Sequence, residues 1–203
     1  RGLDFTFPSV SIPEGGYHGE YLRDVAAAIV AERPDVMVLA APERLAVLKA
    51  AAVRAIVAQQ KADLDRFGER FDPWFYESAL GAAVDRAREK LVGSGETYEK
   101  EGAVWLRTTP HGTNDDKVIV KSDGQPTYLL PDVAYHLDKF ARGFDPVIDL
   151  WGPDHHAHVA EMHAALEILG FPKSRLEIQI VQQVNFIEGG KQVKMSKRAG
   201  RLV

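Results

Sequence analysis

The C-terminal end of the sequence carries two lysines at a spacing that suits phosphate chemistry. Lys194 and Lys197 lie three residues apart in the segment Lys194–Arg198, and glycines flank this segment on both sides (Gly189, Gly190 and Gly200). Two ammonium groups at this spacing on a loop can close over a triphosphate and neutralise the negative charge that develops at its α-phosphate. The alternative is a solvated basic run, because residues 191–203 contain five Lys or Arg and no carboxylate side chain.

A second candidate site follows a segment that predicts a strand, Pro146–Trp151. This segment runs directly into Gly152, Pro153, Asp154, His155 and His156. In open parallel sheets, ligands bind at the carboxyl ends of the strands. A glycine there lets a nucleotide approach the backbone, and the Asp154 carboxylate can accept hydrogen bonds from ribose hydroxyls. The segment therefore predicts a nucleotide site.

The same segment is also compatible with a metal cluster. Asp-His-His after a strand occurs in the DHH phosphoesterases, where it helps to hold a pair of metal ions. Such an enzyme needs further aspartate ligands from other strand ends, and Asp132 and Asp149 are weak candidates for them. We favour the simpler interpretation that His158 and His163 are partly buried helix residues. The cluster would comprise Asp154, His155, His156, His158 and His163.

Tyr128 and Asp132 form a third group of candidate residues. Asp132 follows Pro131 at a predicted helix start, where unpaired backbone N–H groups favour a carboxylate, so Asp132 can act as a cap and nothing more. A carboxylate fixed there is equally suited to a bidentate grip on a guanidinium, with Tyr128 supplying a ring face or a hydroxyl at the pocket wall. The residues alone leave both roles open.

The elements that must position these residues fall into two regions. The first ninety or so residues predict helices over 20–33, 42–66 and 77–92, and we place a mainly helical connecting or insertion module at 1–95. Short strands are expected at 104–107 and 118–121. Extended and helical segments then alternate, which indicates βαβ units and a parallel sheet, hence an α/β fold over 96–203. The alternating segments are 127–130, 131–141, 146–151, 155–169 and 176–181.

Composition narrows the class of protein further. The 203 residues are 45% hydrophobic and 27% charged, which is an ordinary globular composition that can bury a core. The net charge of -4 argues against overall electrostatic attraction to nucleic acid, so any RNA contact must use a local basic patch. The sequence lacks cysteine, which fits a reducing compartment, and we expect a cytoplasmic protein. No apolar stretch approaches the ~18 residues of a membrane span, so no membrane partner is expected.

Taken in order, the motifs closely resemble those of bacterial arginyl-tRNA synthetases, which are class I aminoacyl-tRNA synthetases. The segment Lys194–Lys197 matches the KMSK loop of that class. The resemblance covers nearly the whole chain. It is carried by residues 13–21, 71–74, 128–136, 139–145, 151–156 and 194–200.

The resemblance implies a role for each candidate residue. Tyr128 and Asp132 would contact the substrate arginine, and His156 would occupy a further position in the amino-acid pocket, where other branches of the family carry glutamine. Lys194 and Lys197 would stabilise the transition state of adenylation. The remaining residues would bind ATP, together with these lysines: Gly152, Asp154, His155, Met195 and Ser196.

The resemblance also implies the reaction and the fold. The enzyme would activate arginine with ATP, accompanied by Mg²⁺, and transfer the arginyl group to the 3′ end of tRNA(Arg), with no tightly bound cofactor. The chain would form the second half of a Rossmann-like parallel sheet, preceded by the helical connecting module.

One family motif has no match in the chain. His-x-Gly-His is absent, because neither residues 17–20 nor residues 111–114 fit it. We therefore expect an internal fragment, with that motif before Arg1 and the anticodon-binding domain after Val203. Such a fragment would be inactive alone. The rival interpretations are a DHH-type metallophosphoesterase and a non-catalytic tRNA-binding or structural fragment.

Overall fold

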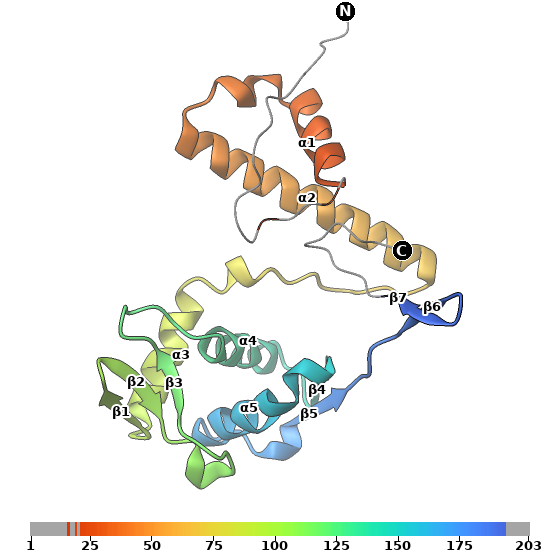
Figure 1. Cartoon of the computed structure of the whole chain (residues 1–203). Helices are drawn as coiled ribbons and strands as arrows, with labels where there is room; N and C mark the ends of the chain where they lie inside the picture. Colours follow the sequence, from red (N-terminus) through yellow and green to blue (C-terminus); the bar gives the residue numbers. More distant parts are fainter. Residues whose placement is uncertain (1–15, 17–18, 20, 194–203) are drawn as a thin grey trace, which may run out of the picture. The chain divides into compact units, whose positions relative to one another are not determined.

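The computed structural model describes residues 16, 19 and 21–193 (Figure 1). The contacts between residues divide the chain into two compact units, one comprising Arg1–Asp72 with Asn185–Val203 and the other Pro73–Val184. The division that the sequence predicts, 1–95 and 96–203, stays a prediction. Among the described residues, no helix is both long enough and apolar enough to cross a membrane.

The first unit contains two helices joined by a short 3₁₀ turn. These are α1 (Tyr21–Glu32), η1 (Pro34–Val38) and α2 (Ala41–Phe67). Pro42 lies in the first turn of α2, where its missing N–H group costs nothing. Gly68 ends the helix in the left-handed conformation (φ 90°); its N–H group bonds to the carbonyl oxygen of Asp65, and the N–H group of Glu69 bonds to that of Leu64. Both predicted helices of this unit are confirmed within one residue at each end.

A hairpin that the sequence did not predict precedes the Lys194–Lys197 segment. Strands β6 (Phe186–Glu188) and β7 (Lys191–Val193) pair antiparallel through a two-residue turn at Gly189 and Gly190. Both glycines have positive φ (56° and 78°), as a tight hairpin turn of this length requires.

The second unit begins with a helix and a small antiparallel sheet. The predicted helix over 77–92 is interrupted: η2 (Glu77–Ala79) and α3 (Ala82–Gly93) are separated at Gly81, whose φ of 40° is incompatible with a continuous helix. Strands β1 (Thr97–Lys100), β2 (Ala103–Leu106) and β3 (Lys117–Val120) follow in the order β1-β2-β3. The strands at β2 and β3 were predicted and β1 was not.

The rest of the second unit is the predicted alternation of helices and parallel strands. It comprises α4 (Leu129–Ala141), β4 (Val147–Trp151), η4 (Pro153–His155), α5 (His156–Ile168), η5 (Lys173–Arg175) and β5 (Leu176–Ile180). β4 and β5 pair in parallel from Val147 opposite Leu176 to Trp151 opposite Ile180. The βαβ unit is therefore confirmed.

The predicted extended segment 127–130 is wrong. Leu129 and Leu130 already belong to α4, and both side chains are buried. Pro131 therefore lies in the first helical turn, where no N–H donor is required. The hydrophobic core that α4 joins is formed with α3, α5 and the strands, and its fully buried side chains include Leu91, Leu106, Ile119, Leu130, Val133 and Met162.

Candidate functional site

Asp132 does not cap α4. It is the fourth residue of the helix, and no side-chain capping bond is formed at the helix N-terminus, which lies at Tyr128. Instead, Asp132 Oδ2 accepts a hydrogen bond from His158 Nε2 on α5 at 3.1 Å. The Asp132 side chain is 49% exposed, whereas that of His158 is only 16% exposed. A largely buried ring thus contacts a carboxylate that is half exposed to solvent.

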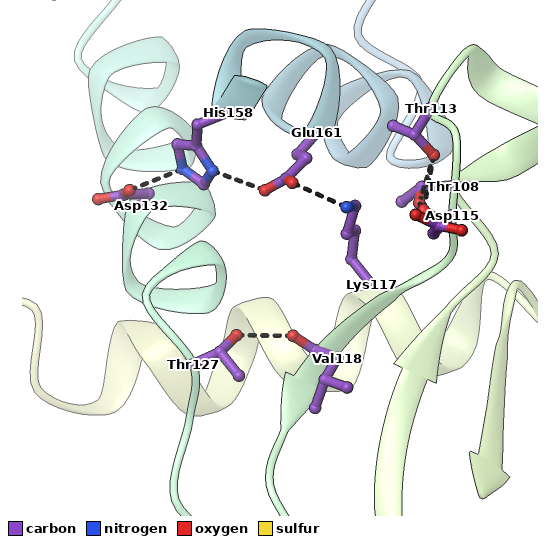
Figure 2. A network of polar contacts seen from close by, with 9 residues as sticks. All are labelled: Thr108, Thr113, Asp115, Lys117, Val118, Thr127, Asp132, His158 and Glu161. Carbon is purple, nitrogen blue, oxygen red and sulfur yellow. Dashed lines mark hydrogen bonds and ion pairs between the residues drawn. The ribbon is translucent and has the colours of Figure 1, made fainter. Parts of the chain in front are cut away.

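His158 is part of a chain of alternating charges that crosses three elements (Figure 2). Its Nδ1 donates to Glu161 Oε2 at 2.8 Å, and Glu161 Oε1 lies 3.0 Å from Lys117 Nζ on β3. Both ring nitrogens of His158 face carboxylate oxygens, so both bonds form only when the ring carries two protons.

The carboxylates around His158 change the protonation of the site. The pKa of His158 is raised above its ordinary value, chiefly by the hydrogen bond to Asp132 and further by Glu161, although burial opposes the shift. Burial would raise the pKa of Glu161, but the bonds from His158 and Lys117 outweigh it and the pKa lies below the ordinary value. Both shifts favour a protonated His158 between two carboxylates.

Trp151 connects this network to the end of β4. Its ring stacks on that of His158 (centroids 5.5 Å apart, 26° between planes) and also lies near that of His155 (5.8 Å). The structure thus brings the predicted arginine-binding residue Asp132 close to the predicted nucleotide segment. His158 and Trp151 are the residues between them.

The predicted ligand residues around Asp132 are open to solvent. Gly152, Asp154 and His155 are exposed in the turn between β4 and α5, and His156, the first residue of α5, is exposed as well. Tyr128, directly before α4, is 91% exposed. Lys194, Met195, Ser196 and Lys197 lie outside the described residues.

Gly152 is not required by the fold of the described residues. It adopts extended backbone angles (φ −71°, ψ 163°), which any residue tolerates, and a Cβ built on it would meet no atom within 4 Å. Neither backbone strain nor packing explains a glycine at this strand end.

A buried ion network fixes the first turn of α4 against β4. Asp149 accepts bonds from His136 Nε2 at 2.7 Å and Lys139 Nζ at 2.6 Å. His136 Nδ1 lies 2.7 Å from the carbonyl oxygen of Asp132. Burial opposes the ionisation of Asp149, but the bonds from His136 and Lys139 prevail and its pKa lies below the ordinary value. The backbone at Asp132 is therefore anchored to the strand.

The metal cluster that the histidines allow is not formed in the described part of the chain, where no three His, Asp or Glu side chains are placed to hold a metal ion. Asp149 is committed to His136 and Lys139. His163, whose pKa is lowered by burial, has a buried Nδ1 with no hydrogen-bond partner among the described residues.

Sequence reasoning missed the role of His158 as a partner of Asp132. It is partly buried on a helix, as predicted, but it also bonds two carboxylates. The spacing His158-x-x-Glu161 is a signal that the sequence contained, because residues three apart on a helix are neighbours. The contact with Asp132, 26 residues away, depends on the packing of α4 against α5.

No protein-family model matches the chain. Among curated proteins, the arginine–tRNA ligase of Shouchella clausii is 44% identical over 195 residues, which cover 95% of this chain and 35% of that protein. The arginine–tRNA ligase of Listeria monocytogenes serotype 4a is 43% identical over 205 residues, covering 100% of this chain and 36% of that protein. The chain spans about a third of the length of the curated relatives it matches.

Two solved structures with a similar fold are also described as arginyl-tRNA synthetases. A structure described as an arginyl-tRNA synthetase from Campylobacter jejuni has a TM-score of 0.82 and 32% identity, and the match covers 93% of this chain and 41% of that one. The arginyl-tRNA synthetase of Thermus thermophilus is 20% identical with a TM-score of 0.57, covering 80% of this chain and 34% of that one, and this likeness supports the fold alone. Along its whole length, the chain is therefore similar to a segment that makes up about a third of each of these arginyl-tRNA synthetases.

Proposed function

We propose that the chain supplies part of the active site of an arginine–tRNA ligase. The full-length protein would use ATP with Mg²⁺ to convert arginine into arginyl-adenylate, and would then transfer the arginyl group to the 3′ end of tRNA(Arg). Homology to ligases of that name supports the reaction. The choice of arginine as the substrate rests on Asp132, a half-exposed carboxylate that His158 holds beside the end of a parallel strand.

Arginine would bind with its guanidinium against Asp132. A carboxylate accepts two parallel N–H bonds from a guanidinium, which gives both strength and geometric selectivity. Tyr128 is available beside it, because its exposed ring precedes α4 directly. His156 would line a further part of the amino-acid pocket.

ATP would lie at the exposed turn after β4. Gly152 would let the nucleotide approach the backbone, and the open space beside its Cα supports this role. Asp154 and His155 would line the ribose site. From the segment after β7, Lys194, Met195, Ser196 and Lys197 would bind the nucleotide, and the two ammonium groups would stabilise charge on the reacting phosphate.

The chemistry that these residues supply is positioning and charge neutralisation. No covalent enzyme intermediate is required, because the arginine carboxylate attacks the α-phosphate and pyrophosphate leaves. The 203 residues by themselves would be inactive, because part of the nucleotide site would come from elsewhere in the full-length protein. We expect that protein to be cytoplasmic.

The direct test is pyrophosphate exchange into ATP by the full-length protein, with tRNA present and each of the twenty standard amino acids, and also citrulline, supplied in turn. The proposal requires a rate of exchange with arginine far above the rate with lysine or citrulline. Only arginine offers Asp132 a group that is both positively charged and planar, the guanidinium. Exchange with another amino acid and not with arginine would overturn it. For any variant of Asp132, Asp138→Asn is a suitable control, since Asp138 is also on α4 but pairs with Arg142 and is assigned no ligand.

A further inference from the structure

Asp132 is held at one oxygen and open at the other. Within the described part of the chain, His158 contacts Oδ2, and the side chain remains 49% exposed. An aspartate in such a place can rotate, and a bidentate bond to a guanidinium requires one orientation of the carboxylate plane. Ordering that side chain on binding would weaken affinity unless it were ordered beforehand.

We propose that His158 is a positioning residue, which fixes the Asp132 carboxylate in the orientation that receives the guanidinium of the substrate. This inference rests on the proposed function, because it assigns a partner to the residue that would grip arginine. His158 itself is on the inner side of Asp132 and would not touch the substrate.

The surroundings of His158 make it a rigid donor. Its ring stacks on Trp151 of β4, and its Nδ1 is held by Glu161 at 2.8 Å. Glu161 is in turn held by Lys117 of β3 at 3.0 Å (Figure 2). The donor that reaches Asp132 is therefore fixed by β3, β4 and its own helix, and a supported group of this kind can orient a neighbour precisely enough for binding.

The charge of His158 does not oppose a bound cation strongly. The groups that face the ring are Asp132 from α4 and Glu161 from α5, with Lys117 of β3 behind Glu161 and the rings of Trp151 and His155 beside it. A guanidinium at Asp132 would extend this series of alternating charges by one. Each cation then has an anion as its nearest neighbour, and the repulsion between cations acts over a longer distance.

The arrangement also makes the positioning dependent on protonation. The raised pKa of His158 keeps both nitrogens protonated beyond the pH at which an ordinary histidine loses its proton. When the ring finally deprotonates, one proton remains for two carboxylates, so one of the two bonds is lost. Arginine affinity is then expected to fall at high pH.

The test compares two variants of the full-length protein by equilibrium binding of arginine. His158→Phe keeps a ring on Trp151 but removes both N–H donors, and we expect the Kd for arginine to rise about tenfold, equivalent to ~1.4 kcal/mol. His158→Gln retains a donor that does not titrate. It should keep the Kd within about threefold of wild type and lose the alkaline fall in affinity, where threefold is under ~1 kcal/mol.

The control is His163→Phe, the same substitution on the same helix at a histidine with no assigned ligand. It should leave the arginine Kd unchanged, and ATP affinity should be unchanged in all three variants. A double-mutant cycle with Asp132→Asn should be strongly non-additive, because His158 acts through Asp132.

Each other outcome overturns the inference. An unchanged or tighter arginine Kd in His158→Phe, with Asp132→Asn impaired, would refute positioning and leave the proposed function standing. If His158→Phe does not fold, a His158→Gln protein with the wild-type pH profile would refute it equally. If Asp132→Asn binds arginine normally, the arginine site itself is misplaced and His158 has nothing to position.

Discussion

His158 Nε2 donates a hydrogen bond to Asp132 Oδ2 at 3.1 Å, which links the first turn of α5 to the first turn of α4. Asp132 is the residue predicted to bind arginine. On its other side, His158 stacks on Trp151, the last residue of β4. This arrangement places the proposed amino-acid and nucleotide sites next to each other, between α4 and the βαβ unit from β4 to β5.

Removing the proton-dependent bonds of His158 should change how stability depends on pH. Since the folded pKa of His158 is raised, its contribution is fully present below about pH 6.5, the ordinary histidine value, and is lost as pH rises through the folded pKa. We expect the difference in unfolding free energy between wild type and His158→Phe to shrink over that rise in pH. Chemical unfolding of both proteins at several pH values measures it, and a constant difference would refute the charged pairing.

The buried carboxylate Asp149 should be essential to the fold. Asp149→Asn would leave Lys139 and His136 without their anion in a buried site, and breaking such a pair typically costs about 3 to 5 kcal/mol. The measurement is the free energy of unfolding at neutral pH. Asp123→Asn is the matched control, because Asp123 pairs with Lys121 at the surface, where an ion pair contributes about 0 to 1 kcal/mol.

The lysine segment should act mainly on the transition state. In the full-length protein, Lys197→Ala is expected to lower kcat for adenylation by about 10² to 10³ and to change KM for arginine little, as removal of one oxyanion-type donor does. Rapid-quench measurement of adenylate formation checks this. A rate within about threefold of wild type, under ~1 kcal/mol, would mean that the segment is only a solvated basic run.

The 203-residue chain alone should not catalyse arginine-dependent exchange of pyrophosphate into ATP, with or without tRNA. Effective catalysis requires both sides of the phosphates to be held together, and we expect residues outside this chain to supply one side. Exchange clearly above a no-enzyme background would show that the chain contains a complete site.

Much of the fold could be read from the sequence, because apolar periodicity marks helices and strands that pack on a core. The βαβ unit from β4 to β5 is an example. Two local features were not predicted. Gly81 interrupts the predicted helix over 77–92. Leu129 and Leu130, which were predicted to be extended, are buried in the first turn of α4. In both places backbone geometry or core packing outweighs the local pattern.

The site was predictable in part for the same reason. Asp132 and the segment after β4 stood out by residue type and position, but their connection through His158 depends on how α4 and α5 pack, which a single sequence does not encode locally. The helix start also differed by two residues, so Asp132 lies at the fourth helical position and forms no cap, and its role toward a guanidinium stays a proposal.

The arginine Kd of the Asp132→Asn variant of the full-length protein, determined together with its thermal midpoint, shows whether Asp132 binds the guanidinium of the substrate. If Asp132 grips the guanidinium, the loss of charge and the introduction of an amide donor should weaken arginine binding by ~2 to 5 kcal/mol. The thermal midpoint should stay near wild type, because Asp132 is half exposed and caps no helix. Asp138→Asn, the matched change on α4, should alter neither quantity appreciably. An arginine Kd for Asp132→Asn equal to that of wild type would contradict the account and remove arginine as the ligand of this site.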